Sequence, residues 1–367
     1  MASRDRVRPA RVPRSTAELL LAWYRQGHRD LPWRRTNDPY RIWVSEIMLQ
    51  QTRAQAVIPY YERFLERFPS ADRLAQTSQE EVLAVWSGLG YYSRARNLRR
   101  AAQQIQAAGG FPREYDAIKQ LPGVGDYTAA AIASIAFGLP HAVADGNVFR
   151  VVARVENDAS DITVPRTRER FRSVAQNWLD PQNPGAFNQA LMELGATVCL
   201  AKNPLCLVCP LTELCRARAE GTAEQLPVKL RRVEPVRIDS IVLVVLRRGR
   251  VLLRQRPASD RRMAGFWELP SPGDLPGLRV GETLGTFRHT ITHHHYSFEV
   301  ATATAKKAGS PYRWFPPAQM PGIPLSTTAR KALEMAGVLE RLGPAAKAAP
   351  AAGAGNAADA ACPERGR

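Results

Sequence analysis

Two carboxylates occupy sequence settings that suit acid–base chemistry. Glu46 lies in WVSEIMLQQT, where helical spacing places it on the same apolar, buried face as Trp43 and Leu49. An unpaired carboxylate is costly to bury, and burial raises its pKa so that it keeps its proton near pH 7. Asp145, in ADGNVFRVVARV, precedes a predicted helix over 146–155. The alternative is that Asp145 serves only as the N-cap of this helix. The two roles are compatible, because capping would lower the pKa of this carboxyl and keep it ionised for chemistry.

Four of the five cysteines fall within seventeen residues, with the spacing C-x6-C-x2-C-x5-C. They are Cys199, Cys206, Cys209 and Cys215. In a chain without a secretion signal, such clustering indicates a metal centre before it indicates disulfides. Thiolates suit zinc or an iron–sulfur cluster, and a zinc site more often shows two separated C-x2-C pairs. The alternative is four unrelated buried thiols.

A glycine turn in LPGVGDYTAAAIASIAFG precedes a predicted helix over 127–137. Gly123 and Gly125 can take positive φ and leave backbone N–H groups free at the helix N-terminus, an arrangement that binds phosphate. A plain turn between two helices needs the same glycines. The strongly basic composition favours the phosphate interpretation.

A second glycine turn, in WSGLGYYSRARNLRRAA, carries Tyr91 and Tyr92 ahead of a basic helix. The arginines of that helix are Arg94, Arg96, Arg99 and Arg100. Aromatic side chains beside a basic face suit stacking on bases or wedging between them. The alternative is a solvated basic helix with core tyrosines.

The formal net charge of +17 and the pI near 10.2 indicate a polyanionic partner. Nucleic acid is favoured over a membrane, because the chain has no run of about 18 apolar residues and no basic amphipathic helix with a broad apolar face. The N-terminal segment has five arginines but lacks the apolar stretch of a signal peptide. We therefore expect a cytoplasmic, nucleoid-associated protein that does not bind membranes.

Residues 15–218 have the periodicity and caps of a mainly α domain. Ser15–Glu18 and Ser78–Glu81 match the capping-box pattern at two helix starts. Further helices are predicted over 52–68, 93–108 and 167–179.

The character of the sequence changes after residue 218. Residues 219–236 are charged and irregular, as in a linker, and IDSIVLVVLRRGRVLLRQRP then predicts a β-hairpin. Short strands and a helix over 325–341 complete a smaller α+β domain, residues 237–342. We expect residues 1–14 to be a basic disordered tail and residues 343–367 an Ala-rich disordered one.

In this order the motifs resemble the helix–hairpin–helix DNA glycosylases of the endonuclease III superfamily, over roughly residues 16–218. The cysteine spacing matches that family's [4Fe–4S] loop, here 199–215. Within the superfamily, WVSEIMLQQT, the Tyr127 position and a β-containing C-terminal domain look like the MutY-type adenine DNA glycosylases. The resemblance implies a monomeric base-excision repair enzyme that hydrolyses the N-glycosidic bond of adenine in double-stranded DNA, opposite 8-oxoguanine or guanine.

The resemblance also implies roles for single residues. Glu46 resembles the general acid, and Asp145 the carboxylate that stabilises the sugar cation. Tyr127 occupies the position of the lyase relatives' lysine, and without that amine the enzyme would be monofunctional. Asn147 and Gln189 resemble polar groups that hold Asp145 and the flipped adenine. Pocket or lesion-side contacts are implied for Trp33, Arg34 and Leu49. Gln51 and Tyr91 resemble residues inserted into the base stack, with Thr52 near the 8-oxoguanine. Asp126 departs from relatives that often carry a basic residue there, which predicts some loss of DNA affinity.

The C-terminal domain resembles a Nudix domain from its first strand to the segment GFWELP. Between Ser271 and His289 its acidic residues are Asp274 and Glu282, and the Arg-Glu pair of the Nudix helix is missing. Because Mg²⁺ needs oxygen ligands, we expect this domain to be catalytically silent. In the related enzymes it reads 8-oxoguanine through a loop that matches Ile291-Thr292-His293 in FRHTITHHH.

Three alternatives stay open on the sequence. The first is a bifunctional endonuclease III-like glycosylase and lyase for oxidised pyrimidines, against which Tyr127 argues. The second is a non-catalytic iron–sulfur DNA-binding module, against which the presence of both Glu46 and Asp145 argues. The third is a nucleotide-hydrolysing Nudix enzyme, which the missing glutamates disfavour.

Overall fold

The computed structural model describes residues 15–230, 234–257, 259–260, 263–291, 293–305 and 308–340. The predicted tails, 1–14 and 343–367, and the lesion-loop residue Thr292 lie outside these ranges. The chain divides into two compact units, the larger built mainly from residues before Arg237 and the smaller mainly from Ile238 onward. No helix in the described ranges is long and apolar enough to cross a membrane.

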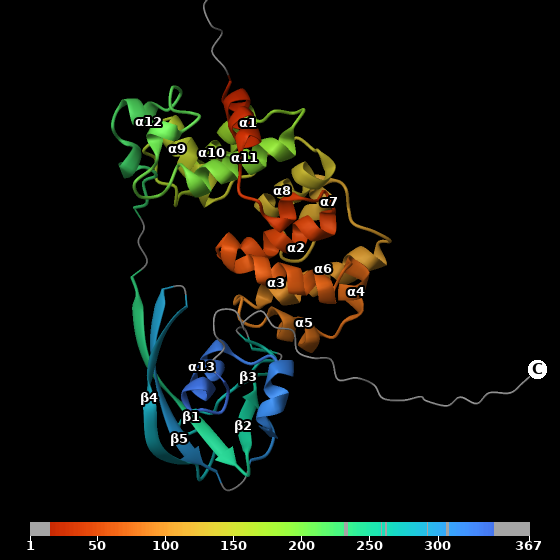
Figure 1. Cartoon of the computed structure of the whole chain (residues 1–367), viewed down its shortest axis with the longest axis vertical. Coiled ribbons are helices and arrows are strands. Elements are labelled where there is room, and N and C mark those ends of the chain that lie inside the picture. The colour runs from red at the N-terminus through yellow and green to blue at the C-terminus, as the bar shows by residue number, and fades with distance from the viewer. Residues whose placement is uncertain are drawn as a thin grey trace, which may run out of the picture. The chain divides into compact units, whose positions relative to one another are not determined.

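The larger unit is helical, as the capping and periodicity predicted (Figure 1). Its helices are α1 (Thr16–Gln26), α2 (Pro39–Leu49), α3 (Ala54–Arg67), α4 (Ala71–Gln76), α5 (Gln79–Trp86), α6 (Ser93–Ala107), α7 (Tyr115–Lys119), α8 (Asp126–Phe137), α9 (Gly146–Val155), α10 (Pro165–Trp178), α11 (Pro184–Thr197) and α12 (Arg216–Ala219). Short 3-10 turns occupy Pro32–Arg34, Cys206–Val208 and Ala223–Gln225.

Local signals fix where the helices of this unit begin. At α1 both capping-box hydrogen bonds form, since Ser15 Oγ accepts from Glu18 N and the Glu18 carboxylate accepts from Ser15 N. At α2 the Asp38 carboxylate accepts from Tyr40 N, and Pro39 occupies the first helical position. Helix α2 is buried over most of its length and packs against α8.

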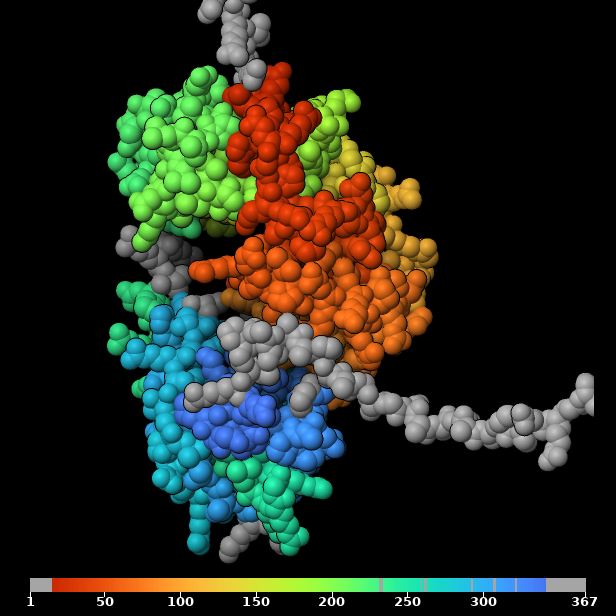
Figure 2. Space-filling model, viewed as in Figure 1, coloured from red at the N-terminus to blue at the C-terminus, as the bar shows by residue number. Residues whose placement is uncertain are grey.

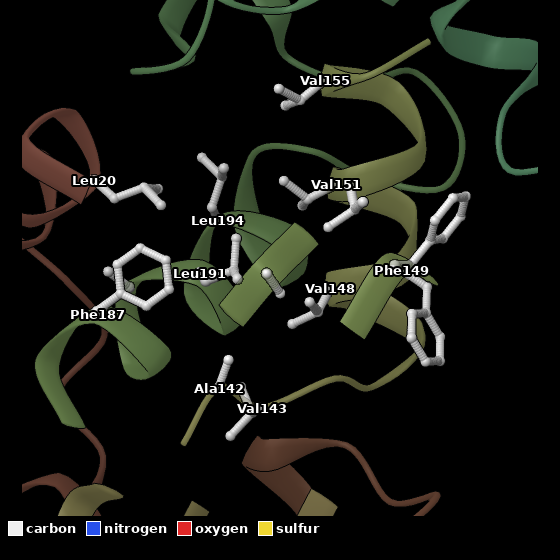
Figure 3. Close-up of a cluster of buried hydrophobic side chains, with 14 of the residues drawn as sticks. Leu20, Ala142, Val143, Val148, Phe149, Val151, Val155, Phe187, Leu191 and Leu194 are labelled. Atoms are coloured by element: carbon white, nitrogen blue, oxygen red, sulfur yellow. The ribbon is translucent and has the colours of Figure 1, made fainter. Parts of the chain in front are cut away.

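One hydrophobic core joins α1, α8, α9, α10 and α11. Figure 3 shows part of it, with side chains from three of these helices and from the segment before α9 pointing toward one another. The labelled side chains are Leu20, Ala142, Val143, Val148, Phe149, Val151, Val155, Phe187, Leu191 and Leu194. In Figure 2 the red surface of α1 lies against the light green of α11, so the first helix packs on a helix more than 150 residues further along the chain. This core holds the start of α9 against α11.

The glycine turn before α8 takes a different form from the one predicted. Gly123 has φ +81°, as expected, and an added Cβ would lie 2.8 Å from the Asn97 side chain. Gly125, in contrast, is the N-cap of α8 with φ −105°, so the prediction of positive φ was wrong there. Its hydrogen faces open space, with no heavy atom within 4 Å of an added Cβ. Gly125 thus provides close access to the helix N-terminus rather than a left-handed turn.

In its described residues the smaller unit is a six-stranded sheet against which α13 (Thr327–Met335) and a 3-10 helix, Pro317–Gly322, are packed (Figure 1). Its strands are β1 (Val236–Arg247), β2 (Arg250–Gln255), β3 (Trp267–Glu268), β4 (Arg279–Ile291), β5 (His294–Thr304) and β6 (Tyr312–Phe315), in the order β3-β2-β1-β5-β4 with β6 paired to β2. The predicted β1–β2 hairpin is confirmed: Arg247 pairs with Arg250, and Arg248 and Gly249 both have positive φ, as a two-residue hairpin turn requires.

Helix α13 (Thr327–Met335) is shorter than the predicted 325–341. Ser326 starts it by accepting a hydrogen bond from Ala329 N, after Leu325 has bridged to Trp267. The helix ends before Gly337, which has φ +68°.

Candidate active site

The Glu46 carboxyl group lies inside the helical unit, on α2, with its side chain 4% exposed. Its Oε2 is buried without a hydrogen-bond partner among the described residues. Burial is the largest influence on this group and raises its pKa to about 7; the Asp145 charge raises it further, while Tyr127 and Arg34 lower it. The apolar environment inferred from WVSEIMLQQT is therefore present, and Glu46 is half protonated near neutral pH.

Tyr127, in the first turn of α8, faces Glu46 across the α2–α8 interface. Its hydroxyl oxygen lies 3.1 Å from Met192 Sδ, and a hydrogen bond between Tyr127 and Glu46 lowers the Glu46 pKa. A thioether is a weak acceptor, so the Glu46 carboxylate is the stronger acceptor for this hydroxyl. Burial raises the pKa of Tyr127 well above its usual value, and Tyr127 stays neutral.

Asp145 is the N-cap of α9, as its position in the sequence predicted. Oδ1 accepts from Asn147 N at 2.9 Å and from Val148 N at 2.8 Å, and Oδ2 accepts from Asn147 Nδ2 at 3.0 Å. The expected low pKa was wrong. Burial raises the pKa of Asp145 above its ordinary value and outweighs the hydrogen bonds, which lower it. The three hydrogen bonds aim the carboxylate and favour its charged form.

Asn147 is itself held from behind by residues that the sequence did not single out. Arg150 Nη2 donates to Asn147 Oδ1 at 2.9 Å and to Gly195 O at 2.6 Å, and Arg150 Nε donates to Cys199 O at 2.8 Å. A Cβ on Gly195 would lie 2.7 Å from Asn147 Cβ, so glycine is needed for α11 to approach α9 this closely.

A buried ion pair forms another wall of the site. Glu193, on α11, accepts from both Arg29 and Arg34 at 2.7 Å. Burial alone would raise the Glu193 pKa, but hydrogen bonds from these two arginines lower it to about 2. The sequence motifs pointed to Arg34 but not to Glu193 or Arg29. These two residues lie far apart in the chain, so no local pattern shows that they pair.

The other predicted pocket residues have different surroundings. Gln189 Oε1 accepts from the Tyr24 hydroxyl at 3.2 Å, and no described hydrogen bond joins Gln189 to Asp145, contrary to expectation. Trp33 is buried edge-on against Tyr61, and Leu49 is the last, partly exposed residue of α2.

Gln51 and Tyr91 both project from strained backbone. Their φ angles are +59° and +48°, in a region that side-chain-bearing residues rarely adopt. Tyr91 is 42% exposed, Gln51 is exposed, and Thr52 is partly exposed beside Gln51. Left-handed non-glycine residues cluster at ligand-contacting sites, where the surroundings enforce them.

The basic helix after Tyr91 does not present all its arginines to solvent. Arg94 is buried, and its guanidinium donates to carbonyl oxygens of the α2 end and of the turn before Tyr91. Arg99 Nε donates to Thr77 O at 2.5 Å. The prediction that these two residues belong to a basic outer face was wrong, because their side chains satisfy carbonyls within the protein.

Asp126, at the start of α8, is paired rather than free to repel a phosphate. Lys119 Nζ lies 2.5 Å from its Oδ1, Arg172 Nη2 lies 3.8 Å from its Oδ2, and the Tyr115 hydroxyl donates to Oδ1 at 3.3 Å. The Lys119 hydrogen bond is the main cause of its lowered pKa. Two cations thus surround one carboxylate beside the glycine turn.

The four clustered cysteines line a single cavity together with Arg154. None of the four forms a disulfide, and burial raises the pKa of Cys209 to about 11. Among the described residues, no group of three or more His, Cys, Asp or Glu side chains is arranged to hold a metal ion as it stands. The donor set still fits an iron–sulfur cluster, because four thiols converge on one cavity and a cationic centre would favour their thiolate form.

In the C-terminal sheet, Ile291 ends β4 and His293 lies in the turn before β5. The Ile291 side chain is 41% exposed, and the His293 ring lies 4.1 Å from the His294 ring. Two residues of the predicted lesion loop therefore lie at a hairpin tip.

The helical fold, its glycine turn, the buried Glu46 and the partly buried Asp145 define a helix–hairpin–helix DNA glycosylase of base excision repair, an enzyme that hydrolyses N-glycosidic bonds. Residues 44–177 match the family model of the HhH-GPD superfamily base excision DNA repair proteins, and residues 241–335 match that of the NUDIX domain. The chain belongs to the adenine DNA glycosylase family.

Two relatives place it there. The mouse adenine DNA glycosylase is 37% identical over 86% of this chain and 76% of its own length, and the human one is 35% identical over 86% and 73%. Among solved structures, a thermostable thymine-DNA glycosylase superposes with a TM-score of 0.51 and 29% identity, covering 56% of this chain and 95% of its own.

Proposed function

We propose that this enzyme hydrolyses the N-glycosidic bond of adenine mispaired with 8-oxoguanine or guanine in duplex DNA. The observation that carries this proposal is the buried Glu46 carboxyl, with a pKa of about 7, close enough to Asp145 to respond to its charge. Glu46 would be the proton donor at neutral pH, and Asp145 is held by three hydrogen bonds that favour its charged form.

In the proposed reaction, Glu46 donates its proton to a ring nitrogen of adenine. The C1′–N bond breaks, and its electron pair leaves with the neutral base. The sugar becomes cationic, and the Asp145 carboxylate stabilises that charge. Water then adds to C1′, and the Glu46 carboxylate takes up the proton that the water releases.

Tyr127 supports a monofunctional enzyme. Its phenol stays protonated, and it offers no amine to form a Schiff base with the sugar. The expected product is an abasic site in an intact strand.

Adenine must leave the base stack before it can reach Glu46, at a cost of a few kcal/mol. Gln51 and Tyr91 are placed on exposed, strained backbone from which they would fill the gap, with Thr52 beside the lesion. Trp33, Arg34, Leu49 and Gln189 would contact the flipped base, and Asn147 would steady Asp145. The turn of Gly123 and Gly125 would hold a DNA phosphate through backbone N–H groups.

Cys199, Cys206, Cys209 and Cys215 would hold a [4Fe–4S] cluster. When bound, the cluster supplies a cationic centre that organises the 199–215 loop against α9. The buried Arg154 supports this arrangement, since its Nη1 lies 3.3 Å from Cys199 Sγ and 2.6 Å from Leu200 O. No step of base removal requires electron transfer.

The C-terminal domain would recognise the lesion and would not catalyse. His293, at the hairpin tip, offers ring nitrogens to 8-oxoguanine, and Thr292 would add a hydroxyl. Ile291 lacks the aromatic ring found at this position in the related enzymes. We also propose that the enzyme acts as a monomer, with a glycosylase domain over 15–218, a linker over 219–236 and a lesion-recognition domain over 237–342.

The test is adenine release from duplexes that contain A opposite 8-oxoguanine, G or C, followed by strand analysis with and without alkali. We expect release from the first two duplexes and strand breaks only after alkali. Strand cleavage of oxidised-pyrimidine DNA without alkali would favour the lyase alternative, and no adenine release from any duplex would refute the proposal.

A further inference from the structure

Arg94 joins the two backbone segments that carry the strained, exposed residues Gln51 and Tyr91. Its Nη1 donates to the carbonyl oxygens of Ile47, Met48 and Gln50 at 2.8, 2.9 and 2.6 Å. Its Nη2 lies 3.4 Å from Leu89 O and 3.2 Å from Gly90 O. One guanidinium therefore contacts five carbonyls from two segments about 40 residues apart.

The first three carbonyls belong to the C-terminal end of α2, where backbone acceptors lack partners within the helix. A cation there also interacts favourably with the helix dipole. Gln51 follows directly, with φ +59°. Arg94 thus caps the helix that carries Glu46 and fixes the chain where it turns toward Gln51.

The other two carbonyls belong to the turn that ends at Tyr91, whose φ is +48°. The Arg94 guanidinium also lies 5.4 Å from the centre of the Tyr91 ring, a cation–π distance. Burial lowers the Arg94 pKa to about 10, so the group stays charged at neutral pH.

We propose that Arg94 is a positioning residue for base flipping: it holds Gln51 and Tyr91 at one fixed separation, ready to enter the base stack. The inference rests on the proposed insertion of these two side chains. Left-handed non-glycine backbone persists only where its surroundings enforce it, and Arg94 supplies that enforcement to both segments at once. A lysine in its place keeps the charge but not the planar fork that spans two segments.

The test compares Arg94→Lys with the matched control Arg99→Lys, which changes an arginine of the same helix that donates to Thr77 O instead. Single-turnover adenine release and the fluorescence of a 2-aminopurine next to the target adenine are measured on an A:8-oxoguanine duplex. For Arg94→Lys we expect release about tenfold slower and a smaller fluorescence rise on binding, since stacking contacts of this kind each change equilibria by about tenfold or more. Arg99→Lys should match the wild type.

A double-mutant cycle separates positioning from general support of the fold. In a Gln51→Ala/Tyr91→Ala background, Arg94→Lys should cost no more than about twofold, because the side chains through which it acts are gone. An equal, about tenfold cost in both backgrounds would overturn the proposal. Wild-type release and fluorescence in Arg94→Lys would overturn it too.

Thermal unfolding of each variant is recorded alongside. Arg94→Gln provides a second substitution, whose side-chain amide can donate hydrogen bonds to one of the two segments but not to both. If both Arg94 variants fail to fold, Arg94 belongs to the folding core and the positioning role is rejected. Failure of the proposed function looks different: the wild type would release no adenine. The fluorescence comparison would then still report whether Arg94 controls unstacking.

Discussion

At the scale of single residues, the site depends on two carboxylates whose environments differ more in hydrogen bonding than in burial. Both pKa values are raised by burial, to about 7 for Glu46. Asp145 receives three hydrogen bonds, whereas Glu46 Oε2 has no partner among the described residues. The contrast assigns the acid to Glu46 and the anion to Asp145.

The raised Glu46 pKa predicts a pH-dependent cost in stability. The folded-state pKa of about 7 exceeds the ordinary value of 4.5, so the folded state holds this proton more tightly, and stability falls as pH rises from 4.5 to about 7 and then levels off. We expect Glu46→Gln to have nearly the wild-type free energy of unfolding at pH 5 and to be more stable than the wild type at pH 8, by up to about 3 kcal/mol. Denaturant melts at both pH values measure this. An equal difference at both would contradict the raised pKa.

At the scale of elements, the start of α9 is positioned by its close packing on α11. Asn147 bonds to Asp145, Arg150 bonds to Asn147, and Gly195 leaves the room for this approach. Asp145, the proposed catalytic anion, is thus positioned by helix–helix packing rather than by a loop.

Gly195→Ala tests this packing. The new methyl would lie 2.7 Å from Asn147 Cβ and must displace it, so we expect kcat to fall at least about tenfold, since a misplacement of about 1 Å can cost a hundredfold. KM should change little, because the change acts on the reacting centre. Gly27→Ala is the control, with no heavy atom within 4 Å of its added Cβ. Equal kinetics for both variants would show that Asn147 does not position Asp145.

Sequence predicted those parts of the site that depend on local pattern. The apolar face around Glu46, the N-cap at Asp145 and the convergence of the cysteines all follow from spacing within a few residues. The sequence predicted Arg94 to be a surface residue because its neighbours in the sequence are basic. Its hydrogen-bond partners, such as Met48 O, lie about 45 positions away in the chain. The raised pKa of Asp145 likewise comes from burial under distant elements, which no local pattern reveals.

At the scale of the whole molecule, the charge of +17 gives the enzyme a strong general attraction to DNA. Asp126 weakens the attraction to DNA beside the glycine turn, because it neutralises part of the charge of Lys119 and Arg172, which both pair with it.

Asp126→Asn should release these cations to DNA phosphates. We expect tighter duplex binding. The slope of log binding constant against log salt concentration should become steeper by about one. The control is Glu156→Gln, which removes the same charge from a pair with Arg216. Binding measured from low to high salt distinguishes the two, and identical slopes would show that Asp126 does not restrain DNA binding.

The pH dependence of single-turnover adenine release from an A:8-oxoguanine duplex tests the central claim most directly. Because the acid must be protonated, the single-turnover rate constant of the wild type should fall as pH rises through about 7, the pKa of Glu46. Glu46→Gln should lose that falling limb together with about a hundredfold or more of the rate. A wild-type rate that is flat between about pH 6 and 8, or a Glu46→Gln enzyme as fast as the wild type, would contradict the assignment of Glu46 as the acid that releases adenine.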